Sequence, residues 1–206
     1  LIGRVVPIKD IKTFIRAIAN LRAMIPDLEA WILGPTDEDE EYFHGCKTLV
    51  SHLGLDGTVK FKGRVKLDDY LGKIDAIALT SISEAQPLVI LEAGAAAIPS
   101  VATDVGACRE MILGRSTESP QLGDGGVVTE LSNPTATANG LARLLMDREF
   151  HGSCSQAIQE RARRYYNKKD LDKTYRDLYE HYRKLDTAHN NEVHPKWPEL
   201  ASSYAS

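Results

Sequence analysis

One stretch of the sequence, residues 76–97, places a buried strand, a polar loop and a buried helix directly after one another. The apolar run at 76–79 is typical of a buried strand, whereas the apolar residues that follow Pro87 have the spacing of a buried helix. A proline fits the first turn of a helix, because its missing N–H group would have no partner there and its φ angle is already set. A strand followed at once by a helix is the building unit of a parallel α/β sheet.

The same alternation of short apolar runs and helical periodicity extends along most of the chain, which predicts a doubly wound, Rossmann-like parallel sheet. The first residues resemble the end of a strand, so we interpret the chain as the second half of a longer protein. The predicted strands lie at 28–33, 58–61, 75–80, 99–102 and 125–129, and the predicted helices at 11–21, 37–53, 67–71, 87–97 and 134–146.

Several loop residues carry specific expectations. We expect Asp10 to cap the first helix, and Thr36 or Asp37 to cap the second. Gly106 follows a predicted strand at the edge where α/β folds bind ligands, which indicates a close backbone approach to a ligand. The polar segment 115–124, which contains Ser, Pro and Gly, predicts a mobile loop.

Composition narrows the class of protein. The chain has 206 residues, of which 43% are hydrophobic and 26% charged, as in an ordinary globular domain. A formal charge of −4 disfavours a nucleic-acid-binding protein, which usually carries a basic excess. No apolar run is long enough to be a transmembrane segment, and we expect no signal peptide. The three cysteines lack metal-type spacing and indicate free thiols, so we expect a cytoplasmic protein.

The loop and the helix start within residues 76–97 predict a phosphate site. The backbone N–H groups of Leu88 and Val89 would point out of a helix N-terminus, where anions bind readily. Glu84 precedes them and Glu92 follows in the second helical turn, and carboxylates accept hydrogen bonds from sugar hydroxyl groups. This combination suggests a nucleotide sugar. The alternative is that both glutamates are solvated surface residues.

The spacing of Glu84 and Glu92 resembles the paired-glutamate motif of the large retaining glycosyltransferase family with the two-domain GT-B fold, family 4. The segment from Ser83 to Ala93 is most similar to the glycosyltransferases of Pel exopolysaccharide synthesis. Three further stretches agree, in the family's order, and the similarity covers about residues 1–185. These stretches are Gly-Arg-Val-Val-Pro-Ile-Lys-Asp at 3–10, Leu-Gly-Pro-Thr-Asp at 33–37 and Val-Ala-Thr-Asp-Val-Gly-Ala-Cys-Arg-Glu at 101–110.

The resemblance implies roles for the matching residues. Arg4 and Lys9 would hold the diphosphate of the donor, with Gly3 in the same motif, and Glu92 would bind the ribose hydroxyl groups. Arg64 opens a loop that would lie against the base, although a solvated side chain is an equal alternative for it. The sugar and the distal phosphate would contact Glu84 and the backbone of Ala85, Gln86, Pro87, Leu88 and Val89.

Some residues depart from the family pattern. Ala85-Gln86-Pro87 replaces a common Gly-Phe-Gly, so a Cβ atom at Ala85 could crowd the sugar, and Pro87 supplies no N–H group. Asp10 replaces a common glycine, and Gly94 and Ala97 replace the usual Met and Gly of the helix. These changes affect the expected sugar more than the expected nucleotide.

The resemblance implies that residues 1–185 form the donor-binding half of a retaining glycosyltransferase that transfers a hexose in polysaccharide biosynthesis. The donor would be UDP-glucose or a similar UDP-hexose, and no metal or other cofactor is expected. Catalytic roles fall to Arg4, Lys9 and Glu84, while the acceptor domain, and with it most activity, would lie in a missing N-terminal half. An association with a membrane polysaccharide machinery is compatible with this resemblance.

Two other functions stay open at this point. A related GT-B enzyme could hydrolyse or epimerise a nucleotide sugar, although no acid–base group beyond the glutamates is evident. A non-enzymatic module could instead bind a nucleotide sugar to regulate a partner. The tyrosine-rich segment 155–185 predicts a solvated helix with an apolar stripe, which in the GT-B fold would pack on the N-terminal domain. Residues 186–206 predict a polar, disordered or loosely packed tail.

Overall fold

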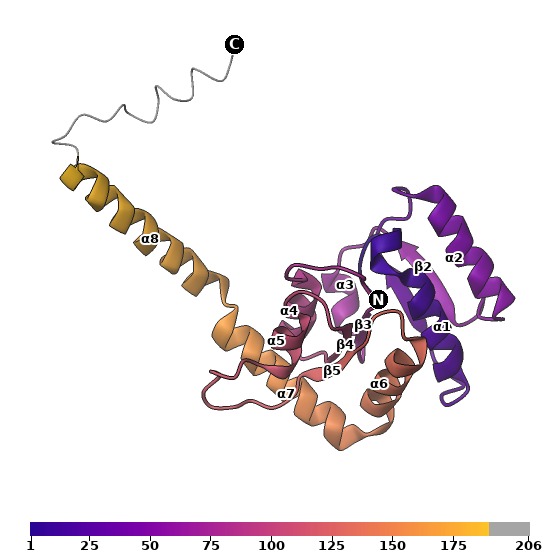
Figure 1. The fold of residues 1–206 in the computed structure, drawn as a ribbon. Helices are drawn as coiled ribbons and strands as arrows, with labels where there is room; N and C mark the ends of the chain where they lie inside the picture. The colour runs from indigo at the N-terminus through magenta and orange to yellow at the C-terminus, as the bar shows by residue number, and fades with distance from the viewer. Residues whose placement is uncertain (190–206) are drawn as a thin grey trace, which may run out of the picture. The chain divides into compact units, whose positions relative to one another are not determined.

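The computed structural model describes residues 1–189 of the chain. It comprises two compact units, Leu1–Tyr165 and a second that begins at Tyr166. All strands of the first unit pair in parallel, as the alternating sequence pattern predicts (Figure 1). They form two sheets instead of one continuous sheet: β1 (Ala30–Leu33) with β2 (Val59–Gly63), and β4 (Ser100–Thr103) between β3 (Ile77–Leu79) and β5 (Gly126–Thr129).

The register of each sheet places the carboxyl ends of its strands at one edge. Ala30 lies opposite Val59 in the first sheet, and in the second sheet Ser100 lies opposite both Ile77 and Gly126. Ile2 adds an isolated parallel bridge to Leu33, which brings the start of the chain alongside β1. The loops that leave β1 to β5 therefore begin close to one another within each sheet.

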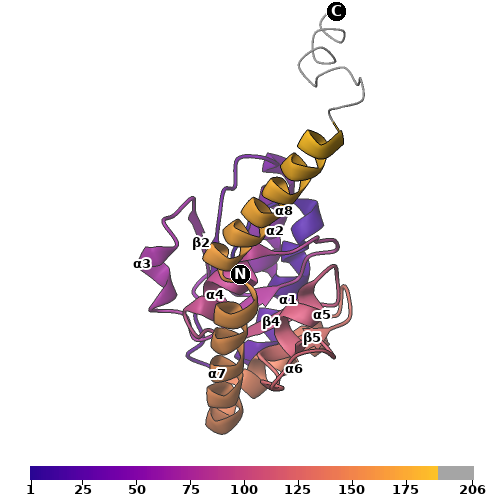
Figure 2. The ribbon, with the colours of Figure 1, turned by 90° about the vertical axis from the view of Figure 1, so that its left-hand side faces the viewer.

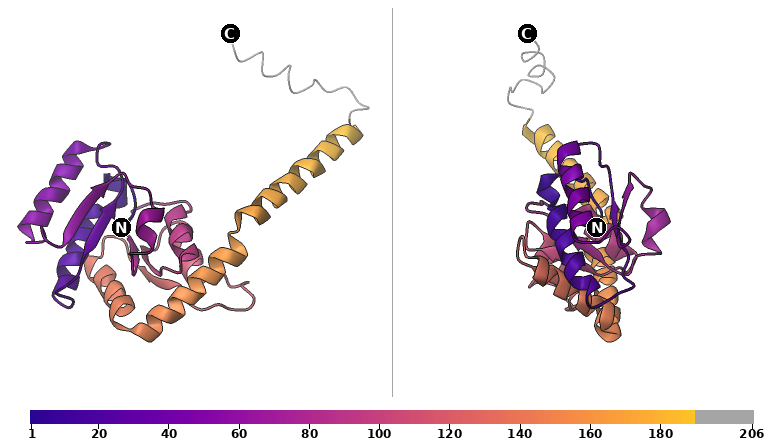
Figure 3. Two further views of the ribbon diagram at one scale, coloured as in Figure 1. Left: turned by 180° about the vertical axis from the view of Figure 1, so that it is seen from behind. Right: turned by 90° about the vertical axis from the view of Figure 1, so that its right-hand side faces the viewer.

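Helices surround these sheets. Figures 1 and 3 show α1 (Ile11–Arg22) and α2 (Glu40–His52) beside the β1–β2 sheet. Figure 2 shows α3 (Asp68–Leu71) and α5 (Cys108–Leu113) on opposite sides of the unit. The remaining helices of the first unit are α4 (Leu88–Ala95), α6 (Pro134–Met146) and α7 (Arg148–Tyr165), and α1 packs against α6.

One hydrophobic core unites the first unit. Helix α1 contributes the side chains predicted by its periodicity, with Ile11, Ile15 and Leu21 fully buried and Phe14 3% exposed. The same cluster of buried side chains includes residues of β1, β2, β3, β4 and α6. The two sheets therefore share a core, and the observed fold is the predicted Rossmann-like α/β fold.

Helix starts differ from the sequence prediction in two places. Pro87 is the residue before α4 and not part of its first turn, because its ψ angle of 108° is extended and the helix begins at Leu88. Asp39 caps α2 by accepting a hydrogen bond from the Tyr42 amide at 2.8 Å, so the predicted caps Thr36 and Asp37 lie before the helix. The first turn of α2 still holds Glu40 and Glu41, whose charges suit the helix dipole.

The polar loop at 115–124, predicted to be mobile, is anchored by a buried ion pair. Arg161 Nε and Nη2 donate to the two carboxylate oxygens of Glu118 at 2.8 and 3.0 Å. Both side chains are only 2% exposed. Arg161 also donates to the carbonyl oxygens of Ile112 and Gly123. A single glutamate within the polar run thus ties the loop to α7, which its composition does not reveal.

The tyrosine-rich segment divides between the two units. Helix α7 ends at Tyr165, and α8 (Lys168–His189) begins after Asn167, whose side chain accepts a hydrogen bond from the Lys169 amide. The apolar stripe of α8 is exposed at Leu171, Tyr175, Leu178, Tyr179 and Tyr182. Helix α8 continues past residue 185, where the tail was predicted to begin, and 190–206 lie outside the described residues. No helix within residues 1–189 is long and apolar enough to cross a membrane.

Candidate functional site

A lysine and a glutamate that are far apart in sequence meet at the carboxyl edge of the strands. Lys9 ends the short 3-10 helix η1 (Pro7–Lys9), and Glu84 lies in the loop between β3 and α4. The Lys9 Nζ atom lies 2.5 Å from Glu84 Oε1, and the two side chains are 19% and 12% exposed. The Ser81 hydroxyl donates to the same carboxylate oxygen at 2.6 Å. We refer to Lys9, Ser81 and Glu84 as the carboxyl-edge cluster.

Backbone contacts fix the two loops that carry this cluster. The Ile82 amide donates to the Ile8 carbonyl oxygen at 2.9 Å. The Thr80 hydroxyl lies 3.1 and 3.0 Å from the carbonyl oxygens of Lys9 and Asp10. These contacts hold the two loops together, in addition to the ion pair between the lysine and the glutamate.

The backbone and side chain of Asp10 explain why an aspartate can replace the glycine that is common in the family. Its backbone is left-handed, with φ at 42°, a conformation that favours glycine but that aspartate also adopts. The Asp10 side chain accepts a hydrogen bond from the Thr13 amide at 3.2 Å and so caps α1 as expected. The aspartate thus keeps the turn beside Lys9 without a glycine.

The start of α4 presents backbone amides beside the loop that holds Glu84. No side chain among residues 1–189 caps this helix, and its first two residues are Leu88 and Val89. The N–H groups at these positions have no acceptor within the helix, so they can bind an anion. Glu92 lies one turn further along α4 and is exposed. Ala85 and Gln86 are exposed in the loop that precedes Pro87.

Three further residues were predicted to bind the donor: Arg4, Gly3 and Arg64. Arg4 pairs with Glu38 at 2.8 Å in an exposed ion pair, a partner that the sequence did not indicate. Gly3 borders the side chain of Lys9, because a Cβ atom at Gly3 would lie 3.8 Å from the lysine Cδ atom. Arg64 is exposed and makes no ion pair or hydrogen bond with the described residues.

Gly106 makes a close approach, but to the protein itself. Its φ angle is +51°, and a Cβ atom there would lie 2.1 Å from the Glu84 carbonyl oxygen and 2.5 Å from that of Ala85. The Ala107 amide donates to the Ala85 carbonyl oxygen at 2.9 Å. The loop after β4 therefore supports the loop that holds Glu84, and the predicted approach of Gly106 to a ligand stays a prediction.

Hydroxyl groups at the ends of β3 and β4 are the site residues that the sequence analysis missed. Ser81 and Thr80 follow β3 directly, and the Thr103 hydroxyl donates to the Ser81 carbonyl oxygen at 2.6 Å. Their position just after predicted strands was the available signal, because polar residues there lie at the edge where ligands bind.

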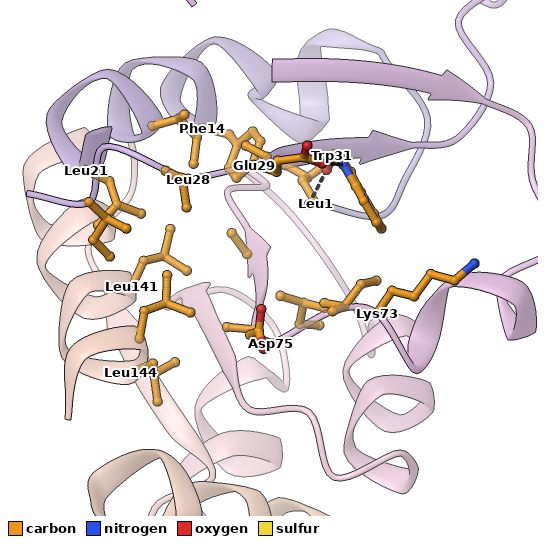
Figure 4. A pocket seen from close by; sticks show the side chains of 18 of the residues that line it. Leu1, Phe14, Leu21, Leu28, Glu29, Trp31, Lys73, Asp75, Leu141 and Leu144 are labelled. Carbon is orange, nitrogen blue, oxygen red and sulfur yellow. Dashed lines mark hydrogen bonds between the residues drawn. The ribbon is translucent and has the colours of Figure 1, made fainter. Parts of the chain in front are cut away.

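A separate cavity of about 660 Å³ lies where β1 and β3 begin, at the amino edge of the strands. Figure 4 shows leucine side chains such as Leu28, Leu141 and Leu144 along one side of it. Glu29, Lys73 and Asp75 are among the polar residues of its lining. None of the predicted donor-binding residues lines this cavity, so we distinguish the amino-edge cavity from the candidate site.

The part of the chain that the structure describes contains no second candidate site built from metal ligands or reactive thiols. No group of three or more His, Cys, Asp or Glu residues within residues 1–189 could hold a metal ion. Cys46, Cys108 and Cys154 are buried, and burial raises the pKa of each thiol to about 11. These cysteines are therefore unsuited to act as nucleophiles.

Comparison with known proteins gives consistent matches over this chain. The family model described as "Glycosyl transferases group 1" matches residues 1–162. N-acetyl-alpha-D-glucosaminyl L-malate synthase of Bacillus anthracis is 27% identical over 173 residues, which cover 84% of this chain and 42% of that protein. The chain thus spans less than half the length of this curated relative.

Two solved structures show the same fold. HepE of Anabaena, solved in complex with UDP, has a TM-score of 0.77 at 21% identity, and the match covers 87% of this chain and 47% of that one. The C-terminal domain of a group 1 glycosyl transferase of Francisella tularensis has a TM-score of 0.70 at 23% identity, with 81% of this chain and 85% of that domain covered. The present fold is therefore one half of a GT-B fold.

Proposed function

Because this chain belongs to the group 1 glycosyltransferases, we propose that it binds the nucleotide-sugar donor of a hexosyl transfer reaction. The observation that carries this proposal is the juxtaposition of the partly buried Lys9–Glu84 pair with the uncapped amides at the start of α4. A cation and free amides suit a diphosphate, and a carboxylate suits sugar hydroxyl groups.

Each residue of the site has a proposed role. Lys9 and the amides of Leu88 and Val89 bind the diphosphate, Glu84 accepts hydrogen bonds from the hexose, and Glu92 binds the ribose. Arg4 joins the diphosphate by exchanging its exposed Glu38 partner, an ion pair that contributes little in water. The backbone at Gly3, Ala85, Gln86 and Pro87 shapes the site, and Arg64 lies against the base.

We propose UDP-glucose or a similar UDP-hexose as the donor. HepE of Anabaena, which shares this fold, has been solved with UDP and with UDP-glucose. The resemblance to Pel and other family 4 enzymes extends the proposal to polysaccharide synthesis in the cytoplasm, and to association with a membrane polysaccharide machinery. The acceptor would bind to an N-terminal domain in the intact protein, so this chain alone would bind the donor and transfer little.

The proposed reaction retains the configuration of the anomeric carbon. Negative charge develops on the diphosphate as it leaves the sugar, and Lys9, Arg4 and the two amides stabilise it. One preorganised donor of this kind contributes about 3 kcal/mol to transition-state stabilisation. Glu84 and Glu92 orient the hexose and the nucleotide, which is a positioning effect. These cations supply positive charge where a metal ion would otherwise be needed, so we propose a reaction without a metal.

Calorimetric titration of this chain with UDP, ADP and GDP tests the proposal. We expect UDP to bind, and Lys9→Ala and Glu92→Ala to weaken binding while both variants keep the thermal unfolding profile of the wild type. A folded chain that binds none of the three nucleotides, alone and within the intact protein, would overturn the proposal. With the intact protein, product analysis then distinguishes transfer from hydrolysis of UDP-glucose.

A further inference from the structure

Ser81 is a buried residue that joins the glutamate of the site to the sheet. Its exposed fraction is 0%. Its hydroxyl donates to Glu84 Oε1 at 2.6 Å, and its carbonyl oxygen accepts a hydrogen bond from the Thr103 hydroxyl at 2.6 Å. Thr103 is the last residue of β4 and is 1% exposed. A chain of hydrogen bonds therefore runs from the central strand of the second sheet to the Glu84 carboxylate.

The two oxygens of Glu84 are used differently. Oε1 accepts from both Lys9 Nζ and Ser81 Oγ, at 2.5 and 2.6 Å. Oε2 accepts no hydrogen bond from the residues that the structure describes. A carboxylate held by one oxygen can offer the other to an incoming hydroxyl group, because each oxygen has two lone pairs.

We propose that Ser81 is a positioning residue for recognition of the donor sugar, which rests on the function proposed above. Without Ser81, only the flexible side chain of Lys9 would hold Glu84, and the diphosphate also needs that lysine. When the diphosphate draws the ammonium group away, the Ser81 hydroxyl keeps Oε1 in place and leaves Oε2 free for the hexose. Fixed hydrogen bonds of this kind orient the groups that contact a ligand.

The proposal separates binding of the sugar from binding of the nucleotide. UDP lacks the hexose, so it binds Lys9 and the amides of α4 without a contact to the free Oε2 atom of Glu84. Loss of the Ser81 hydroxyl therefore weakens UDP-glucose binding and spares UDP binding. A residue that only stabilised the fold would change both affinities together or neither.

Calorimetric titration of the 206-residue chain with UDP and with UDP-glucose tests this. For Ser81→Ala we expect roughly tenfold weaker UDP-glucose binding, the effect of one lost hydrogen bond to a charged group, and UDP affinity within about twofold of the wild type. Ser83→Ala is the matched control, because Ser83 is exposed in the same loop, and should leave both affinities unchanged.

Thr103 provides a second test that does not alter the loop. Thr103→Val removes the hydroxyl but keeps the shape, so it should weaken UDP-glucose binding in the same direction, whereas Thr103→Ser should restore it. These variants decide the question if Ser81→Ala does not fold. Equal effects on UDP and UDP-glucose, or no effect on either, would overturn the role of Ser81 while leaving the proposed function intact. A wild type that binds neither ligand would overturn both.

Discussion

Two of the ion pairs that join distant residues, Lys9–Glu84 and Arg161–Glu118, differ in how many further hydrogen bonds they make. Lys9–Glu84 lies at the carboxyl edge, 19% and 12% exposed, and one oxygen of its carboxylate accepts no hydrogen bond from the described residues. Arg161–Glu118 is 2% exposed on both sides and bidentate. Its arginine also donates to two carbonyl oxygens, and its glutamate also accepts from the Leu122 amide.

This difference shows what makes an ion pair available to a ligand. A buried pair with every group satisfied has no capacity for another partner, and breaking it leaves an uncompensated charge. A partly exposed pair with free acceptor capacity can exchange its partners when a ligand arrives. We therefore assign Arg161–Glu118 to the fold and Lys9–Glu84 to the site, although both pair a basic side chain with a glutamate.

The largest expected effect comes from breaking the buried pair. Arg161→Met should lower the free energy of unfolding by about 3–5 kcal/mol, because Glu118 would remain buried without a cation. Chemical denaturation measures this loss. The control is Arg163→Met, which removes an arginine that pairs with Glu160 on the surface of the same helix and should change stability little. Equal losses in the two variants would refute the structural role of Arg161.

Breaking the Lys9–Glu84 pair should change ligand binding more than stability. Lys9→Ala should weaken UDP binding on the order of a hundredfold, since a charged contact with the diphosphate is lost. Titration calorimetry checks this, and Lys73→Ala is a lysine control at the amino-edge cavity. If Lys73→Ala weakened UDP binding more than Lys9→Ala, the assignment of the site to the carboxyl edge would be wrong.

A smaller effect is expected where the loop after β4 supports Glu84. Gly106→Ala would place a Cβ atom 2.1 Å from the Glu84 carbonyl oxygen, so the loop must move. We expect roughly tenfold weaker UDP-glucose binding, the loss of about one well-placed hydrogen bond. Gly123→Ala shares a positive φ angle, of +85°, but has no atom within 4 Å of the added Cβ. Gly106→Ala should lose more stability than Gly123→Ala, because only its Cβ atom meets backbone atoms, and only Gly106→Ala should lose affinity.

The smallest expected effect is a loss of stability at acidic pH. The hydrogen bonds from Arg161 hold the pKa of Glu118 below its usual value of 4.5. Because the folded state lowers this pKa, ionised Glu118 stabilises the fold above pH 4.5, and that contribution is lost as the pH falls through the folded pKa. The unfolding free energy of the wild type should therefore decrease more steeply below pH 4.5 than that of Glu118→Gln. Denaturation series between pH 6 and pH 3 measure both slopes, and parallel curves would exclude this contribution.

Local patterns in the sequence determined much of this protein. Apolar runs and helical periodicity depend on neighbouring residues, so they predicted the parallel α/β fold and most helices and strands within a few residues. The strand–loop–helix order also predicted the free amides at the start of α4. The motifs around Glu84 and Glu92 predicted a glycosyltransferase, and the match to the group 1 glycosyltransferase family agrees with that prediction.

Only the tertiary structure decided which polar side chains are partners. Lys9 meets Glu84 across 75 positions of the chain, Arg161 meets Glu118 across 43, and Arg4 pairs with Glu38. Such contacts depend on how the core packs and where each loop closes, and no local pattern records them. A glutamate in the sequence is compatible with a binding site, a buried anchor or a solvated surface. Burial and hydrogen-bond partners distinguish these roles, and both exist only after the chain has folded.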